Sequence, residues 1–264
     1  MSLAKSRACI YRAAPLTPRP ALVSELLAQQ ISIRDCGDSA LRLTAAYSDR
    51  ERNWLTVQAL AVWLREYDVP GVRGVVPTYD SLLVEFDPVT TDHQNLRYMI
   101  SLRLETLDDG MLGNRASGTV FHVPVVFGGE YGPDIESVSE KLALPIRDVI
   151  GIVCRSALKI RCLAQAGAPM LDGPGFPSPV ARRQDPRTSV PSGSVVVAGI
   201  QANVIPTPAP CGWQLLGRTP LTLVDVQNSP ILAYRPGDSL KFFPIKEAEW
   251  EKYQNTPLGE IDAR

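Results

Sequence analysis

The stretch that decides the fold is VVVAGIQANVIP, residues 195–206, in which short apolar runs end at a glycine and a proline. Two similar stretches follow, GWQLLGRTPLTLVD at 212–225 and DSLKFFPI at 238–245. Short strands separated by turn residues are typical of a barrel, in which every strand edge is paired. We therefore predict a closed or nearly closed β-barrel in the C-terminal part of the chain.

Immediately upstream, residues 168–191 have neither helical nor strand periodicity and contain six of the 23 prolines. We interpret this stretch as a long loop, and long loops inside compact domains tend to be functional or mobile. Arg182 and Arg183 lie in it. These two cations could recruit an anion or form a solvated face.

The N-terminal half alternates strands and helices. Residues 31–43 indicate two strands broken by a glycine turn, and 72–86 indicate a hairpin. Asp49 is placed to cap the first helix, and Thr91 or Asp92 to begin the second. This order predicts a small α+β sandwich. The expected fold class is therefore α+β, with a small mixed N-terminal lobe followed by the barrel lobe.

These patterns divide the chain into four parts. The parts are an N-terminal extension at 1–29, an α+β lobe at 30–115, a barrel lobe at 116–246 and a C-terminal tail at 247–264. The barrel lobe is expected to begin with a strand at 120–127 and helices at 135–142 and 145–153. The first 23 residues are basic and contain no acid, so the extension is either a floppy segment or a transit peptide.

The charges balance, with 27 Lys and Arg against 28 Asp and Glu among 264 residues. Nucleic-acid binding depends on many uncompensated cations, so we expect no nucleic-acid partner. No apolar run reaches the roughly 18 residues of a membrane span, so we expect no membrane partner. The two histidines, His93 and His122, exclude a zinc site built on several histidines, and we expect both to be structural or surface residues.

The five cysteines are odd in number and are never spaced as C-x-x-C. This pattern fits reduced thiols better than a disulfide framework or a zinc knuckle. We therefore expect a cytoplasmic protein without a bound metal.

Six ordered motifs together resemble one family. They are GDSAL at 37–41, PGVRGVVPTYDSLLVEFDP at 70–88, VPVVFGGEYGPD at 123–134, PRTSVPSGSVVVAG at 186–199, GWQLLGRTP at 212–220 and RPGD at 235–238. In these blocks the chain is similar to the family of 5-oxoprolinase B subunits, also known as allophanate hydrolase subunit 1. The motifs keep the family order and cover most of the chain.

The resemblance implies a carboxyltransferase domain with a cyclophilin-like barrel, and a homologous partner, the C subunit. In bacterial 5-oxoprolinase the B and C subunits join a third, the A subunit, and ATP-dependent opening of the 5-oxoproline lactam gives glutamate. Relatives also form part of urea carboxylase, and one inhibits a sporulation kinase. We therefore expect a hydrolase that acts on a small cyclic amide within a hetero-oligomer. ATP is the expected cofactor, bound by this chain or by a partner.

The GWQLLGRTP motif contains most of the residues that we expect to meet the substrate. The Arg218 guanidinium can hold a carboxylate through two parallel hydrogen bonds, and the Gln214 amide suits a lactam, so both are catalytic candidates. Thr219 and Trp213 are substrate-binding candidates. The alternative is structural: Arg218 would pair with a carboxylate such as Asp225, and Trp213 would belong to the barrel core.

Three further residues complete the predicted site. Arg187 and Gln201 are substrate-binding candidates, although Ile200 stands where the family's GEQT segment has an acid. Glu130 is the carboxylate best placed for general-base catalysis. The glycine-rich turn around it would either bring backbone amides near an anion or end in Asp134 as a helix cap.

The chain departs from the family between residues 150 and 185. Val153 stands where family members commonly carry a histidine, and only Gly175-Phe176-Pro177 remains of a GF-x-PGF-x-YLGG loop. Our leading hypothesis is a component of an ATP-dependent 5-oxoprolinase. The second is a diverged member that catalyses an isomerisation or cyclisation, because valine cannot move a proton. The third is a non-catalytic regulator of a partner protein.

Overall fold

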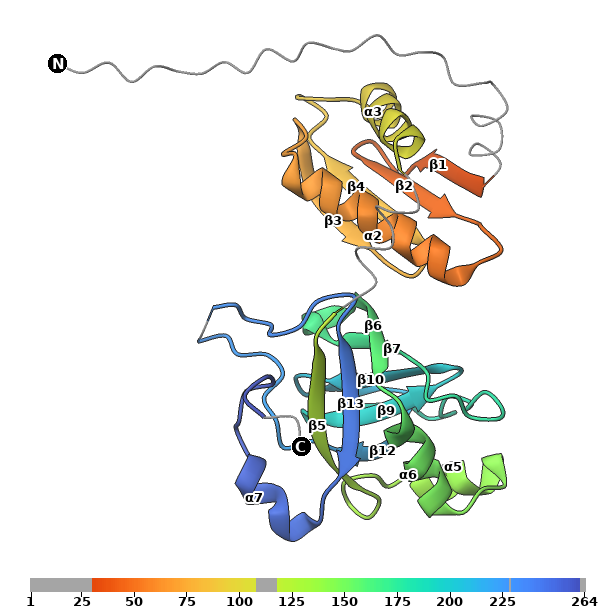
Figure 1. Cartoon of the computed structure of the whole chain (residues 1–264), viewed down its shortest axis with the longest axis vertical. Coiled ribbons are helices and arrows are strands. Elements are labelled where there is room, and N and C mark those ends of the chain that lie inside the picture. Colours follow the sequence, from red (N-terminus) through yellow and green to blue (C-terminus); the bar gives the residue numbers. More distant parts are fainter. Residues whose placement is uncertain (1–29, 108–117, 228, 262–264) are drawn as a thin grey trace, which may run out of the picture.

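The computed structural model describes residues 30–107, 118–227 and 229–261, which form two lobes (Figure 1). The predicted N-terminal extension lies outside the described residues. The smaller lobe is a sheet with helices and the larger one is a closed barrel, so the predicted α+β class with a barrel lobe is confirmed. Within the described ranges, no helix is long and apolar enough to cross a membrane.

The N-terminal lobe is an antiparallel sheet in the order β1-β2-β4-β3 with two helices. Its elements are β1 (Ile31–Asp35), β2 (Ala40–Ala45), α2 (Arg50–Glu66), β3 (Val72–Pro77), β4 (Ser81–Phe86) and α3 (His93–Glu105). Alternate residues of β2 and β4 share one core with both helices. Both predicted caps are confirmed, since Asp49 accepts from Glu51 N and Asp92 from Asn95 N.

The barrel contains seven strands in the order β10-β7-β6-β13-β5-β12-β9, and β9 pairs with β10 to close it. The strands are β5 (Val120–Phe127), β6 (Leu158–Leu163), β7 (Pro169–Asp172), β9 (Ser194–Ala198), β10 (Gln201–Ile205), β12 (Gln214–Arg218) and β13 (Ser239–Pro244). Every neighbouring pair is antiparallel except β13 and β5, which run parallel. The barrel predicted from the 195–245 stretches is therefore confirmed.

The interpretation of residues 168–191 as a loop is wrong in part. This range contains β7 and also β8 (Arg187–Val190), which pairs with β11 (Ala209–Cys211) in a separate two-stranded sheet. Proline at the first position of β7 is compatible with pairing because proline is tolerated where a strand begins. A prediction based on proline content and missing periodicity therefore missed two short strands.

The remaining elements lie around the barrel. They are α5 (Ile135–Leu142), α6 (Ile146–Arg155), α7 (Trp250–Tyr253) and the short 3-10 helices η1 (Gln165–Gly167) and η2 (Glu247–Glu249). The barrel lobe was predicted to end at residue 246. The structure nevertheless packs Tyr253 and Leu258 into the barrel core, so part of the predicted tail stabilises this lobe.

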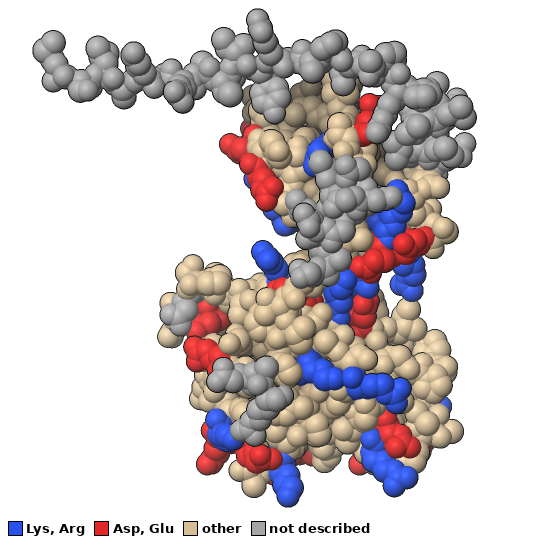
Figure 2. Space-filling model, in the orientation of Figure 1, with Lys and Arg blue, Asp and Glu red and all other residues tan. Residues whose placement is uncertain are grey.

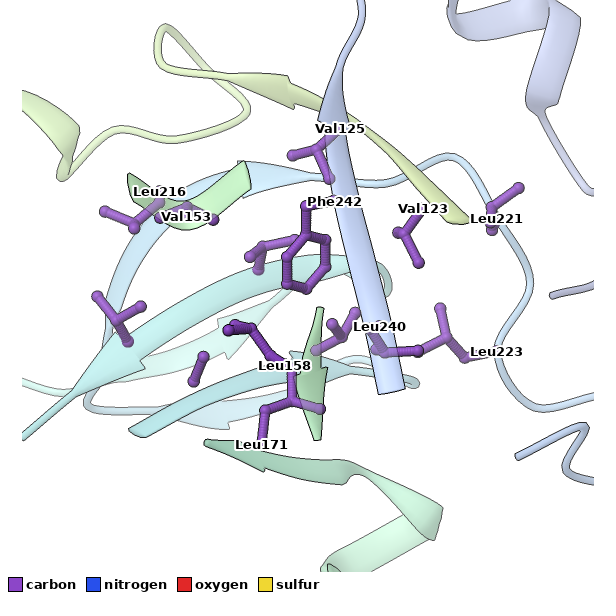
Figure 3. Packing of buried hydrophobic residues seen from close by; sticks show 14 of the residues in the cluster. Val123, Val125, Val153, Leu158, Leu171, Leu216, Leu221, Leu223, Leu240 and Phe242 are labelled. Atoms are coloured by element: carbon purple, nitrogen blue, oxygen red, sulfur yellow. The ribbon is translucent and has the colours of Figure 1, made fainter. Parts of the chain in front are cut away.

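The barrel interior is filled by aliphatic side chains around Phe242 (Figure 3). Val123 and Val125 come from β5, and Leu171 comes from β7. Val153 projects from α6 into the same cluster and is 1% exposed. Val153 is therefore a core residue of the barrel lobe.

The two lobes meet where α2 lies against β6. The Trp54 indole N–H donates to the Arg161 carbonyl at 2.7 Å, and the Arg161 guanidinium lies over the same ring at 5.1 Å. Glu51 pairs with Lys159 and Arg161, and Arg161 forms a two-pronged pair with Asp172. Charged side chains of both signs are visible at this junction (Figure 2). We call Trp54, Glu51, Lys159, Arg161 and Asp172 the inter-lobe latch.

The turn after β5 crosses β12 at Gly132, where a Cβ atom would lie 1.9 Å from the Leu216 carbonyl oxygen. We predict that Gly132→Ala lowers the free energy of unfolding by about 3 kcal/mol, the upper end of the usual cost of overpacking, because backbone must move to relieve the overlap. Gly151→Ala is the matched control, because a Cβ there meets nothing within 4 Å and lies inside α6. It should stabilise by about 0.5–1 kcal/mol. Urea unfolding measures both, and similar values for the two variants would contradict the prediction.

Candidate functional site

A buried carboxylate, Asp134, connects three of the sequence motifs. It accepts hydrogen bonds from both Arg187 terminal nitrogens and from Arg183, each at 2.8 Å, and from the backbone N–H of Leu215 at 2.7 Å. Burial alone would raise the pKa of Asp134, but the Arg187 and Leu215 hydrogen bonds and the two guanidinium charges lower it. Asp134 is therefore an ionised, fully bonded group that holds β12 against residues 183–187.

Two sequence expectations change at this point. Asp134 stands at the N-cap position of α5, but its side chain makes no capping hydrogen bond, so the predicted cap is wrong. The Asp134 oxygens instead accept hydrogen bonds from Arg183 and Arg187, and such charged donors bind a carboxylate more strongly than the backbone N–H groups of a helix end do. Arg183 pairs with Asp134 and so does not form the solvated face that we considered, whereas Arg182 is exposed and lies 5.6 Å from the Trp213 ring centroid. Arg187, a predicted substrate-binding residue, has both terminal nitrogens on Asp134.

Three other predicted site residues lie on or beside β12 and are largely enclosed. Gln214 is 2% exposed, and its amide nitrogen donates to the Ala181 carbonyl at 2.9 Å. Thr219 is 2% exposed, and its hydroxyl accepts from Leu221 N. Trp213 packs partly buried against a small cluster beside the two-stranded sheet rather than in the main barrel core. The binding roles of these residues stay predictions.

Arg218 and Glu130 lie around one pair of aromatic rings. The Arg218 Nε donates to the Ser192 carbonyl at 2.8 Å, and the guanidinium lies 5.2 Å from the centroid of Trp250. Trp250 contacts Tyr131, with centroids 4.9 Å apart. Arg218 makes no ion pair with another described residue, so it does not form the structural pair with Asp225 that we considered. We call Arg218, Glu130, Tyr131 and Trp250 the Arg218 cluster.

The groups around Tyr131 change the pKa of its hydroxyl. Partial burial first, and then Glu247 and Glu130, raise the pKa of Tyr131, whereas Arg218 lowers it. Its hydroxyl also donates to Glu247 at 3.4 Å. The structure thus brings two predicted catalytic residues, Glu130 and Arg218, to the same surface. Sequence reasoning missed Tyr131 and Trp250, although Tyr131 directly follows Glu130 in the GGEYGPD motif.

Gln201 lies elsewhere, at the start of β10 and beside a cavity of about 500 Å³ between the lobes. The other walls come from the first turn of α2, the turn between β3 and β4, and the end of β7 with the segment that follows. Gly175 and Phe176 also line the cavity. The predicted site is therefore divided between this cavity, the Arg218 cluster and the Asp134 network.

No set of three or more His, Cys, Asp or Glu is arranged to hold a metal ion among the residues that the structure describes. His93 contacts the Gly37 carbonyl at 3.1 Å and the edge of Phe86, as expected for a structural histidine. The described cysteines are free thiols, and burial raises the pKa of Cys162 to about 11, so it stays protonated. ATP binding stays a prediction.

The chain is similar to proteins of one family over most of its length. The family described as carboxyltransferase domain, subdomain C and D, matches residues 31–233. A protein named as the B subunit of 5-oxoprolinase from Bacillus subtilis (strain 168) is 32% identical over 84% of this chain and 96% of its own length. A protein of the same name from Escherichia coli O157:H7 is 30% identical over 76% and 88%. The chain therefore belongs to the carboxyltransferase-domain family that includes the proteins named as 5-oxoprolinase B subunits.

Solved structures agree with this membership. A crystal structure of TTHA0988 superposes with a TM-score of 0.68 at 26% identity, over 81% of this chain and 40% of that one. The chain thus spans about two fifths of TTHA0988. The Kluyveromyces lactis urea carboxylase superposes with a TM-score of 0.66 at 18% identity, over 84% of this chain and 22% of that one, which shows a shared fold alone.

We predict that Asp134→Asn costs about 3–5 kcal/mol of stability at neutral pH, because it leaves two guanidinium groups without their buried charge partner. Since the folded-state pKa of Asp134 is lowered, its contribution is present above the unfolded pKa of about 3.9 and is lost as the pH falls through the folded value. The difference between wild type and variant in urea unfolding should therefore shrink below about pH 4.

Asp38→Asn is the matched control, since Asp38 is an exposed residue in the turn between β1 and β2. It should change stability by less than about 0.5 kcal/mol. A pH-independent difference between wild type and Asp134→Asn would show that the carboxylate charge is not what stabilises the network.

Proposed function

We propose that this chain is the B-type component of a 5-oxoprolinase-type complex, which hydrolyses the lactam of a cyclic amide to give glutamate. The observation that carries the proposal is the match to proteins named as 5-oxoprolinase B subunits, at 32% identity over 96% of the length of one of them. A homologous C-type partner and an A-type protein complete the complex. ATP drives the reaction and binds this chain or a partner, in the cytoplasm.

Within that complex we assign the substrate carboxylate to Arg218. The Arg218 Nε donates to the Ser192 carbonyl, and the guanidinium group lies over the Trp250 ring. These two contacts orient the guanidinium and leave its two terminal nitrogens as parallel donors for a carboxylate. A carboxylate accepts such a pair in one geometry, so the ring of the substrate would be oriented at the same time. The arrangement supports a role for Arg218 in substrate orientation.

Glu130 serves as the general base in this proposal. It lies in the exposed turn after β5, and its charge acts on Tyr131 together with that of Arg218. A carboxylate in such a place can take a proton from water as the water attacks the lactam carbonyl. Gln214, with its amide on the Ala181 carbonyl, supports β12 and so positions Arg218 at its end.

A diverged reaction is the second candidate, and the observation that favours it is Val153. This residue fills the barrel core, and no proton transfer can pass through its side chain. An isomerase or cyclase would use Arg218 to hold the same kind of carboxylate. Conversion of 5-oxoproline to glutamate, which needs ATP in the leading proposal, separates the two candidates.

The proposal is tested with the complete complex, reconstituted from this chain and its A-type and C-type partners. We predict that Arg218→Ala lowers kcat/KM for glutamate release by the equivalent of about 2–4 kcal/mol, roughly 30- to 900-fold. Arg218→Lys should recover only part of the loss, because an ammonium cannot form the parallel pair. Arg147→Ala, at an exposed arginine of α6, is the control.

Two results would contradict the proposal. A folded, complete complex without turnover of 5-oxoproline would eliminate the reaction. Full activity of Arg218→Ala would eliminate the assigned carboxylate contact and would favour the regulator hypothesis if a partner protein still responds to the variant.

A further inference from the structure

The inter-lobe cavity is lined by neither Arg218 nor Glu130, so it is a separate place on the molecule from the Arg218 cluster. Its volume of about 500 Å³ falls in the range of small-molecule sites. Two lobes contribute to it, and sites between lobes are common because both surfaces can supply polar groups. The inter-lobe latch holds these two surfaces together.

One part of the cavity is apolar. Trp54 is oriented by its indole hydrogen bond to Arg161, and Phe176 lies among the lining residues. Ile200, the residue directly before β10, also lines the cavity and is 56% exposed, although it is a large apolar residue. An organic ligand would cover this exposed surface and gain free energy from its burial.

Most of the charges around the cavity are already neutralised. Glu51 and Asp172 are acidic lining residues, and both pair with Arg161, while Glu51 also pairs with Lys159. Asp80 is the third carboxylate, and it accepts from the Ser81 hydroxyl. Because Arg161 is taken up by two of these acids, Arg50 is the cation of the described lining that remains for a ligand, and a single cation favours a ligand with one negative charge over a nucleoside triphosphate.

Three polar groups of the lining are unused. Among the described residues, Arg50 and the Gln201 side chain make no hydrogen bond or ion pair, and the buried hydroxyl of Tyr79 has no partner. An unpaired buried hydroxyl is costly, and a ligand oxygen would offset that cost. Burial first, and then the nearby Cys162 and Asp172, raise the pKa of Tyr79 far above its usual value, so it remains a donor. These groups come from α2, β10 and the β3–β4 turn.

We propose that the inter-lobe cavity is a binding site for a small organic monocarboxylate that also carries an N–H group. Arg50 and Tyr79 donate to its oxygens, and the Gln201 or Asp80 side-chain oxygen accepts from its N–H. Trp54, Phe176 and Ile200 contact its carbon skeleton. This site is separate from the Arg218 cluster, and its existence does not depend on the proposed reaction.

The test is calorimetric titration of the full chain with defined probes. 5-Oxoproline has both a carboxylate and an N–H, 2-pyrrolidinone lacks the carboxylate, and N-methyl-5-oxoproline lacks the N–H. We expect 5-oxoproline to bind at least about tenfold more tightly than either analogue, because each lacks one bonded group. ATP should not compete with it.

Variants locate the binding site. Arg50→Ala and Gln201→Ala should each weaken 5-oxoproline binding about tenfold or more, whereas Arg34→Ala, at an exposed arginine of β1, should not change it. Since Arg50 and Gln201 are not fully buried, removing their side chains should leave the fold intact, which unchanged urea unfolding would verify.

Several outcomes would overturn the inference. Binding of none of the probes at about 10 mM would do so, as would binding that Arg50→Ala and Gln201→Ala leave unchanged. Loss of binding in Arg218→Ala alone would assign the ligand to the Arg218 cluster. ATP binding that depends on Arg50 would show that the cavity binds a nucleotide rather than a small monocarboxylate. Since none of these measurements uses turnover, the cavity and the proposed reaction succeed or fail separately.

Discussion

The buried carboxylate of Asp134 is the interaction on which the barrel lobe depends most. Four donors, from segments 49 to 81 residues away in sequence, meet on its two oxygens. Such a group stabilises only when every donor is present, because each buried charge would be costly alone. It fixes β12 against the 183–187 segment, and β12 carries Gln214 at one end and Arg218 at the other. The position of the Arg218 cluster therefore follows from Asp134.

A second network fixes the relation between the lobes. Its ion pairs are partly exposed, and pairs of that kind contribute little individually. Trp54, at 2% exposure and with its indole N–H on Arg161, supplies the directional contact. Arg161 pairs with both Glu51 and Asp172 of the cavity wall, and its pair with Glu51 also joins the two lobes. The shape and the charge of the cavity are thus set by the same residues that hold the lobes together.

Sequence reasoning succeeded where the deciding contacts are local. Asp49 and Asp92 cap helices within two or three residues of themselves, and the turn before β2 uses Gly37 at a φ of 67°. It failed where distant residues decide. Asp134 has the sequence features of a cap, yet two arginines about 50 residues away take its oxygens. The cavity could not be predicted either, because Arg50 and the other polar groups of its wall come from separate elements and share no pattern in sequence.

The parallel pairing of β13 with β5 has a consequence for how the chain folds during synthesis. The strands β5 and β6 are made early in this lobe, but β13, which lies between them, ends only at Pro244. The barrel cannot close until that residue has left the ribosome, whereas the N-terminal lobe has no such dependence, because its sheet and helices are complete by Glu105. Contacts of such long sequence separation slow folding. The unpaired edges of β5 and β6 would therefore be exposed on the nascent chain for most of the synthesis of this lobe.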